Sequence, residues 1–151
     1  MAKTSAGILL HRSGPEVLLV HPGGPFWAKK DAGAWSIPKG LCDPDENPEL
    51  AARREFAEEV GSVPPGPLVR LGEFKQPGGK IVLAFALRGD FDPATLVSNT
   101  FPIEWPPRSG RTITIPEVDR AGWFGLDAAR EKLLKGQQPI LDAFVERIAL
   151  P

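Results

Sequence analysis

Three closely spaced glutamates, Glu55, Glu58 and Glu59, are well suited to binding a hard metal cation. On a helix, like charges at i and i+4 repel each other by roughly 0.2–0.5 kcal/mol per pair, and Arg54 offsets that repulsion only in part because Arg before Glu is the weaker orientation. A divalent cation explains the order Arg-Glu-x-x-Glu-Glu, since Mg²⁺ binds several oxygen ligands, keeps some of its waters and pairs with substrate phosphates. The spacing therefore predicts a magnesium and phosphate site, with a solvated helix surface as the alternative.

A helix from about Pro48 to about Val60 would position these carboxylates. Asn47 can cap the free N–H groups of the first turn, a proline suits that turn, and Gly61 is a typical stop. At about 100° per residue, the glutamates share one face with Ala51 and Ala52. We expect the opposite face to pack on the core, and it carries Leu50, Phe56, Ala57 and Val60, with Arg53 fitting it poorly.

The segment around this helix resembles the Nudix box of the Nudix hydrolase superfamily. That pattern is Gly-x5-Glu-x7-Arg-Glu-U-x-Glu-Glu-x-Gly-U, with U a bulky aliphatic residue. The matching positions run from Gly40 through Glu46 to the run that starts at Arg54, and every charged and glycine position is present. Two U positions differ, because Phe56 is aromatic and Ser62 is polar; both concern packing and not metal binding. The chain is thus similar to MutT-like nucleoside polyphosphate pyrophosphohydrolases.

The resemblance implies a metal site with Mg²⁺ or Mn²⁺ as the cofactor. Its ligands would be the backbone carbonyl of Gly40 and the carboxylates of Glu55, Glu58 and Glu59. Arg54 would orient Glu58 or Glu59 and would not touch substrate. The bound cation would keep the clustered carboxylates ionised and would lower the pKa of a water that attacks phosphorus.

In Nudix proteins, an acid from outside the box often completes the site, and one commonly sits shortly before a Trp. Glu117, upstream of Trp123, is the first candidate, and Glu104 is the reserve. Either Glu55 or Glu117 would accept the proton of the attacking water, and the sequence leaves both open. Glu46 is expected to brace the loop that leads into the helix.

Aromatic and basic side chains in loops are candidate substrate contacts, because Trp can stack on a nucleobase while Lys and Arg can pair with phosphate. One loop precedes the box, and another follows a strand-like run later in the chain. The candidates are Trp27, Lys29, Lys39, Trp105 and Arg108. Each also has a structural explanation, in which the tryptophans cover the core or a turn and the basic residues are solvated.

Apolar, β-rich runs predict strands through the first two-thirds of the chain. They pair around short turns as residues 5–12 with 16–21, 68–76 with 80–88, and 100–105 with 111–115, and a short strand is expected at 35–37. Trp123 and Phe124 are expected to start the last strand. His11 and His21 end the first two runs, where a surface or hydrogen-bonded histidine is a better interpretation than a metal ligand.

Helices are expected after the last strand, from about residue 126 to 135 and from 139 to 149. Strands first, with one helix among them and two helices near the end, predict the α+β class. The resemblance sharpens this to the Nudix fold, an α/β/α sandwich with a mixed central β-sheet.

Length and composition limit the partners. The 151 residues fit one domain, which we assign to residues 1–151, and the formal net charge of −1 argues against general attraction to nucleic acid or to a membrane surface. No apolar run approaches the roughly 18 residues of a membrane span. A single cysteine, Cys42, excludes an internal disulfide and receives no functional assignment. We therefore expect a cytoplasmic protein, and a homodimer is left open.

These observations predict a pyrophosphohydrolase that cleaves a diphosphate linkage in a nucleoside diphosphate linked to another group. A nucleoside triphosphate or a dinucleoside polyphosphate is preferred, because the run Trp35–Gly40 resembles members that act on polyphosphates. A capped RNA end is chemically similar, but the chain has no basic stripe. The alternative is a non-catalytic nucleotide-binding or regulatory module, although such modules usually lose box carboxylates that this chain keeps. An isomerase of isoprenoid diphosphates would need additional Cys or His residues.

Overall fold

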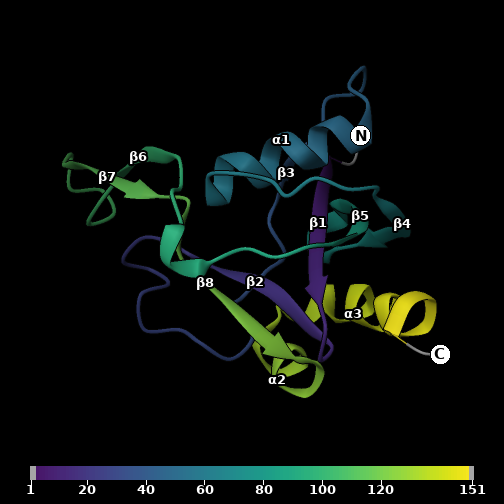
Figure 1. The fold of residues 1–151 in the computed structure, drawn as a ribbon. Coiled ribbons are helices and arrows are strands. Elements are labelled where there is room, and N and C mark those ends of the chain that lie inside the picture. The colour runs from purple at the N-terminus through teal and green to yellow at the C-terminus, as the bar shows by residue number, and fades with distance from the viewer. Residues whose placement is uncertain (1–2, 150–151) are drawn as a thin grey trace.

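A mixed six-stranded β-sheet forms the centre of the fold in a computed structural model that describes residues 3–149 (Figure 1). Its strand order is β4-β5-β1-β2-β8, and β3 pairs with the first part of β1. β1 and β5 run parallel, whereas the other neighbours are antiparallel. The strands are β1 (Thr4–Arg12), β2 (Glu16–Pro22), β3 (Lys39–Leu41), β4 (Val69–Lys75), β5 (Ile81–Arg88) and β8 (Val118–Gly125).

Helices cover both faces of the sheet. Successive residues of a strand point to opposite faces, so the apolar strands present core residues on each side for a helix to cover. In β1, Ile8 and Leu10 pack in the cluster that contains Phe56 of α1. Leu9 packs in a second cluster on the other face, together with Phe144 of α3. This arrangement confirms the predicted α/β/α sandwich with a mixed sheet. The helices are α1 (Pro48–Val60), α2 (Leu126–Lys132) and α3 (Gln138–Phe144), with 3₁₀ turns at Pro77–Gly79, Pro93–Thr95 and Lys135–Gln137 and a π-helical turn at Val145–Ala149.

The ends of α1 lie where the sequence predicts them. Asn47 Oδ1 accepts hydrogen bonds from the backbone N–H groups two and three residues later, at 2.9 and 3.2 Å, and Gly61 ends the helix with a φ of 106°. The predicted division of the helix faces is partly wrong, since Ala51 and Ala52 are fully buried whereas Leu50 is 65 % exposed. The small alanines lie in the same core cluster as the inner strands of the sheet, so the glutamate face is half turned toward the protein interior.

Most predicted strands and helices form, with three corrections to their positions. The β1–β2 and β4–β5 hairpins are present, but residues 35–37 make only single bridges, because they pass between Val20 on one side and Leu133 on the other. Trp123 and Phe124 lie near the end of β8 and not at its start, since they pair with the first half of β2. α2 ends at Lys132, where the chain turns to form the bridge at Leu133. Of the helices between residues 3 and 149, none combines the length and apolar character that crossing a bilayer requires.

A separate hairpin of β6 (Thr100–Glu104) and β7 (Thr112–Pro116) projects away from the sandwich in Figure 1. Its base is attached to the C-terminal end of α1, because Asn99 N donates a hydrogen bond to Glu58 O at 2.9 Å. Glu117 follows β7 directly, and its backbone N–H donates to Asn99 O at 2.8 Å. After the hairpin, the chain therefore comes back beside the C-terminal end of α1 at Glu117, just before β8 begins.

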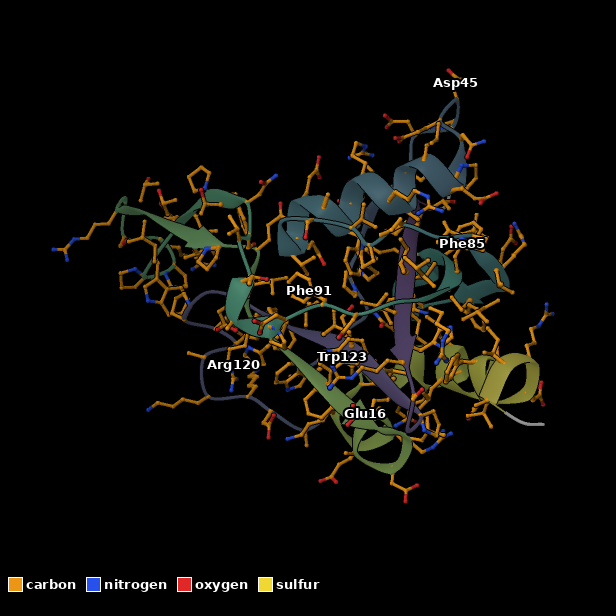
Figure 2. The ribbon with its side chains drawn as sticks, in the orientation of Figure 1. Glu16, Asp45, Phe85, Phe91, Arg120 and Trp123 are labelled. Carbon is orange, nitrogen blue, oxygen red and sulfur yellow. The ribbon has the colours of Figure 1, made fainter. Side chains whose placement is uncertain are left out.

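The segment between β5 and this hairpin is held against β8. Trp123 donates from Nε1 to the carbonyl oxygen of Phe91 at 2.8 Å, and both residues are labelled in Figure 2. The guanidinium of Arg12 lies 4.0 Å from the centroid of the Trp123 ring. These contacts determine where the chain leaves the sandwich to form the hairpin.

Candidate active site

Glu55 is the most buried carboxylate of α1, with 9 % of its surface exposed. It packs against the Cα of Gly40 in β3 so closely that a Cβ at that position would overlap its Oε2 atom. Gly40 is held in place by the pairing of β3 with β1, where it lies opposite Ala6. The box glycine is thus needed for close approach, and the contact brings the backbone of β3 beside the Glu55 carboxylate.

Arg54 connects the carboxylates of the box. It donates from Nε and Nη2 to the two oxygens of Glu46, each at 3.0 Å, in a two-point ion pair. Its Nη1 lies 2.7 Å from Glu55 Oε1 and 3.3 Å from Glu58 Oε1. Glu46 also accepts a hydrogen bond from the backbone of the loop that leads into α1, so it braces that loop as predicted. Arg54 contacts Glu58, one of its two predicted partners, and Glu55 in place of Glu59.

Glu59 faces the beginning of β3. Its Oε1 accepts a hydrogen bond from the backbone N–H of Lys39 at 3.2 Å. Burial raises the pKa of Glu59 to about 8; the hydrogen bond and charge of Lys39 oppose the rise, and the negative charges of Glu117 and Glu55 add to it. In the absence of a cation, Glu59 therefore keeps its proton near neutral pH.

Two neighbouring carboxylates have raised pKa values for related reasons. Burial, followed by the negative charge of Glu58, raises the pKa of Glu117. Burial also raises the pKa of Glu55, where Arg54 opposes the rise and Glu58 reinforces it. Among residues 3–149, no arginine pairs with Glu59 to offset its burial. Burial, with added negative charge from neighbouring glutamates, thus raises the pKa values of Glu55, Glu59 and Glu117 in one small region.

The donor groups of this region fit a hard divalent cation. Carboxylate and carbonyl oxygens are the ligands that Mg²⁺ prefers. The raised pKa values of three carboxyl groups, caused first by burial, mean that a bound cation would favour their charged forms. Among residues 3–149, no three acidic, histidine or cysteine side chains converge closely enough to enclose a metal ion. A cation here would complete its shell with water and phosphate oxygens, and the ligand set of Gly40, Glu55, Glu58 and Glu59 stays a prediction.

A cavity of about 170 Å³ opens beside these carboxylates. Lys39 contributes a cation to its wall, Glu59 and Glu117 contribute acids, and Trp27 contributes an aromatic ring. The remaining wall residues are Val20, Pro22, Ala34, Ser36, Val118 and Leu134. Two predicted substrate contacts and two predicted catalytic acids therefore meet in one place. A nucleotide suits this combination, because its base can stack on Trp while its phosphates meet cations.

The other predicted substrate contacts lie away from this cavity. Lys29 is exposed and does not line it. Trp105 and Arg108 lie at the end of the β6–β7 hairpin farthest from its attachment to α1. The reserve acid Glu104 caps the same turn, since its two oxygens accept hydrogen bonds from Arg108 N at 2.9 Å and Gly110 N at 3.2 Å. The turn therefore has a structural explanation, and the cavity lining gives no support to a substrate wall there.

Gln137 was not identified from the sequence, although it fixes the segment that leads to Lys39. It is fully buried, its Oε1 accepts a hydrogen bond from Ile37 N at 3.0 Å, and its Nε2 donates to Ser36 Oγ at 2.9 Å. It lies 100 residues after Ile37 and in a short 3₁₀ turn, where no periodic pattern marks a buried position. Its neighbours are Gly136 and the equally polar Gln138, so nothing in the local sequence singles it out.

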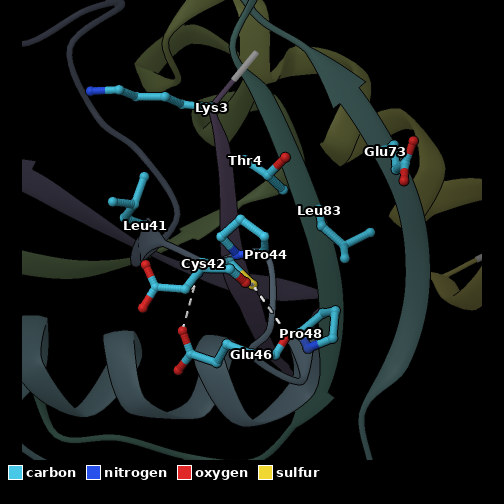
Figure 3. A pocket seen from close by; sticks show the side chains of 10 residues that line it. Lys3, Thr4, Leu41, Cys42, Pro44, Glu46, Pro48, Glu73 and Leu83 are labelled. Carbon is cyan, nitrogen blue, oxygen red and sulfur yellow. Dashed lines mark hydrogen bonds between the residues drawn. The ribbon is translucent and has the colours of Figure 1, made fainter. Parts of the chain in front are cut away.

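A second and larger cavity, of about 560 Å³, lies beside the loop that leads into α1 (Figure 3). Much of its wall is apolar, with Leu41, Pro44, Pro48 and Leu83. Its charged lining residues are mainly acidic, namely Asp43, Glu46 and Glu73 against Lys3. Both cavities have more carboxylates than lysines in their walls. The smaller one is the better candidate for a nucleotide, because its acids lie on or beside α1 and Trp27 adds an aromatic ring to its wall.

Comparison with known protein families gives one match that covers most of the chain. The model described as NUDIX domain matches residues 1–144. That range includes the carboxylates of α1, Glu117 and every residue that lines the smaller cavity.

Curated relatives match over a shorter segment. Over 56 residues the chain is 43 % identical to an RNA pyrophosphohydrolase of Caulobacter vibrioides, which covers 34 % of this chain and 33 % of that protein. Over 61 residues it is 36 % identical to an RNA pyrophosphohydrolase of Rhodospirillum rubrum, covering 38 % and 37 % of the two chains. The match thus spans about a third of the length of these relatives.

Solved structures show the same fold over nearly the whole chain. A C. elegans Ap4A hydrolase binary complex aligns with a TM-score of 0.65 at 20 % identity, covering 96 % of this chain and 98 % of that one. The NUDIX domain of Shewanella oneidensis NrtR complexed with ADP ribose aligns with a TM-score of 0.65 at 20 % identity, covering 98 % and 89 %. At this identity the likeness concerns the fold alone.

Proposed function

This chain belongs to the NUDIX family, whose model covers residues 1–144, and on that premise we propose that it is a Mg²⁺-dependent pyrophosphohydrolase of nucleoside polyphosphates. The bond that breaks would be a phosphoanhydride between two phosphates of a nucleoside triphosphate or a dinucleoside polyphosphate. Mn²⁺ could replace Mg²⁺, because both are hard cations that accept carboxylate and phosphate oxygens.

The observation that carries the proposal is the meeting of Glu59, Glu117, Lys39 and Trp27 at one cavity. An acidic group with a pKa raised to about 8 is unusual on a solvated helix surface and is common where a cation belongs. A lysine beside it can bind phosphate, and a tryptophan on the same wall can bind a base. These are the groups that hydrolysis of a nucleotide anhydride requires.

The reaction would use the residues as follows. Gly40, Glu55, Glu58 and Glu59 would hold the cation, which when bound would neutralise charge on the phosphate oxygens and lower the pKa of a water. Glu117 accepts a proton from that water as its oxygen bonds to phosphorus. The phosphorus–oxygen bond on the far side breaks, and the leaving phosphate takes the electron pair.

Glu117 is a better proton acceptor than Glu55 on the geometry of this site. Glu117 lines the cavity, whereas Glu55 does not and is occupied by Arg54 at 2.7 Å and by the backbone of Gly40. A carboxylate that neither ion-pairs with arginine nor packs under β3 is free to exchange a proton with substrate water. Glu55 is then assigned to metal binding, with Arg54 holding it and Glu58 in orientation.

A 5′-triphosphate end of RNA is a second candidate substrate, favoured by the relatives named RNA pyrophosphohydrolase. Its terminal nucleotide carries the same phosphoanhydride bonds as a free nucleoside triphosphate. The net charge of −1 gives no general attraction to an RNA strand, so free nucleotides stay the first choice. A non-catalytic nucleotide-binding module is the competing class, and the retained carboxylates argue against it.

The test is product analysis with Mg²⁺ on nucleoside triphosphates, dinucleoside polyphosphates, ADP-ribose, nucleotide sugars and 5′-triphosphate RNA. We expect cleavage of one class, and Glu59→Gln should lower kcat by roughly 10²–10³-fold, as loss of one transition-state charge contact does. Glu49→Gln is the matched control, because Glu49 is an exposed glutamate in the first turn of the same helix. Tight nucleotide binding without turnover would favour the binding module, and equal turnover in both variants would remove Glu59 from the site.

A further inference from the structure

His21, near the end of β2, is fully buried and uses both ring nitrogens. Its Nδ1 lies 2.8 Å from Asp119 Oδ1 in β8, and its Nε2 lies 2.6 Å from the backbone carbonyl oxygen of Lys30. The ring also packs edge-on against Trp35, with 5.2 Å between the ring centroids. His21 therefore connects β8 with the loop of residues 23–34.

Both polar partners of the ring are hydrogen-bond acceptors. The carbonyl of Lys30 can only accept, so His21 donates to it from Nε2, and the Asp119 carboxylate can accept from Nδ1. A carboxylate on one nitrogen of an imidazole fixes the orientation of the ring and of the other nitrogen. Asp119 thus holds His21 in the orientation that presents Nε2 to the loop.

The loop of residues 23–34 is attached at both ends, at Lys30, and through the side chain of Asp31, which accepts a hydrogen bond from Trp35 Nε1 at 2.8 Å and ion-pairs with Lys132. At its start, Gly23 N donates to Glu117 O at 3.0 Å, and near its end Gly33 N donates to Glu131 O at 3.0 Å. For residues 24–30, the contact with His21 is the one hydrogen bond to a group outside the loop within the described part of the chain. Residues 24–30 are therefore held by His21 and by the packing of Trp27 against the core, and the anchored side chain of Asp31 restrains the residue that follows them.

Trp27 lies three residues before this attachment. The backbone N–H of Lys30 donates to Trp27 O at 2.9 Å, so the position of Lys30 restrains that of Trp27. The Trp27 side chain lines the cavity together with Lys39 and Glu59. A chain of contacts therefore runs from His21 through Lys30 to the aromatic wall of the cavity.

We propose that His21 is a positioning residue for the substrate, which holds Lys30 and thereby Trp27 at the cavity wall so that the ring can receive the nucleotide base. This inference rests on the proposed function, because it needs a nucleotide in that cavity. No hydrogen bond joins His21 to a carboxylate of α1 in residues 3–149. Loss of the contact should therefore weaken nucleotide binding and leave the chemical step intact.

A matched pair of variants separates the contact with Lys30 from simple burial. His21→Gln keeps an amide N–H near the position of Nε2, whereas His21→Asn is shorter and keeps one only near Nδ1. His11→Asn is the control, because His11 is the other buried histidine at the end of a strand and packs on Phe144, away from the loop. Asp119→Asn serves as a second variant should His21→Asn fail to fold.

The readouts are kcat and KM with the substrate found above, and the Kd for α,β-methylene analogues of ATP and GTP with Mg²⁺. His21→Asn should raise KM and Kd by about tenfold, a part of what base stacking on an aromatic ring contributes, with kcat within about twofold of wild type. His21→Gln should restore most of the affinity. His11→Asn should lower Tm without changing Kd.

The outcomes distinguish this inference from the proposed function. If His21→Asn binds as wild type does, or if His21→Gln is no better than His21→Asn, the positioning role is wrong while hydrolysis stands. An equal loss of affinity in His11→Asn would show that replacing any buried histidine weakens binding, and the positioning role of His21 would be wrong. If the wild-type protein binds the analogues but cleaves no substrate, the hydrolase proposal is wrong and the Kd values alone decide the role of His21. If the wild-type protein neither binds nor cleaves, the proposed function and the role of His21 are both wrong.

Discussion

The carboxylate cluster of α1 and the wall of the neighbouring cavity are held together in different ways. In the cluster, Arg54 reaches Glu46 eight residues away and the glutamates beside it. In the wall, His21 contacts Asp119 across 98 residues, and Gln137 contacts Ser36 across 101. The difference teaches that the proposed metal ligands come from one short segment, whereas the proposed proton acceptor Glu117 and the cavity wall around it depend on packing between distant segments.

Gly40→Ala tests the local side of this comparison and should have the largest effect. The added Cβ would overlap Glu55 Oε2 and push that carboxylate away from β3. We expect kcat/KM to fall by about 10²-fold, as misplacement of a catalytic group by about 1 Å can do. Gly125→Ala is the control, because its φ is −65° and nothing lies within 4 Å of a Cβ there. Activity of Gly40→Ala within about twofold of the control would show that the close approach is not required.

Trp27→Ala tests the distant side and should act on binding. Removing a stacking partner should raise KM by about tenfold, while kcat stays within about threefold of wild type. Steady-state kinetics at saturating Mg²⁺ separates the two constants. Phe101→Ala is the control, since Phe101 is an exposed aromatic residue of the hairpin outside the cavity. A fall in kcat with unchanged KM would show that Trp27 acts on the chemical step and would contradict its assignment to substrate binding.

The pKa of Glu59 predicts how Mg²⁺ stabilises the protein at different pH. Burial raises the pKa of its carboxyl from the ordinary 4.5 to about 8 in the folded protein, so the folded state binds the proton more tightly and stability falls as pH rises through that range. The change is at most about 1.4 kcal/mol per pH unit. A cation takes the place of the proton, so the gain in Tm from Mg²⁺ over EDTA should be larger at pH 8 than at pH 6.

The same measurement on two variants assigns this effect to its residue. Glu59→Gln cannot bind or release the proton and should lose most of the pH dependence of the Mg²⁺ effect. Glu49→Gln, exposed in the first turn of α1, should keep it. A gain in Tm that does not change between pH 6 and pH 8 in the wild type would contradict the proton exchange.

The hairpin end should show the smallest effect. The double variant Trp105→Ala/Arg108→Ala removes both side chains that the sequence suggested as a substrate wall, and neither lines the cavity. We expect kcat and KM within about twofold of wild type, since surface substitutions away from a site are usually near neutral. A rise in KM of about tenfold would bring the hairpin into substrate binding and would restore the original prediction.

The helix that carries the three glutamates, α1, could be predicted almost to the residue. Asn47 and Gly61 mark its ends by their local conformational preferences, which do not need the rest of the fold. The faces of that helix were less predictable, because Ala51 and Ala52 are weakly hydrophobic and their burial depends on how closely α1 approaches β1. Leu50 is exposed for the same reason, since only one side of the helix meets the sheet.

The strands were predictable where both partners are adjacent in the chain. The β1–β2 and β4–β5 hairpins need only a turn between two apolar runs. The parallel pairing of β1 with β5 and the single bridges of residues 35–37 could not be derived in this way, because they join segments far apart. For the same reason, the sequence marked Trp105 and Trp27 as equal candidates, and only the fold separates them.

The sequence by itself determined the helix that carries the clustered carboxylates, and the tertiary structure decided which other groups join them. Carboxylates at helical spacing, with Arg54 and Gly40 in the same short segment, belong together in any fold that forms α1 beside β3. The cavity wall exists only after β2, β8 and the loop of residues 23–34 have packed together. Side-chain periodicity describes one element at a time, whereas a substrate site on several elements depends on contacts that no local pattern records.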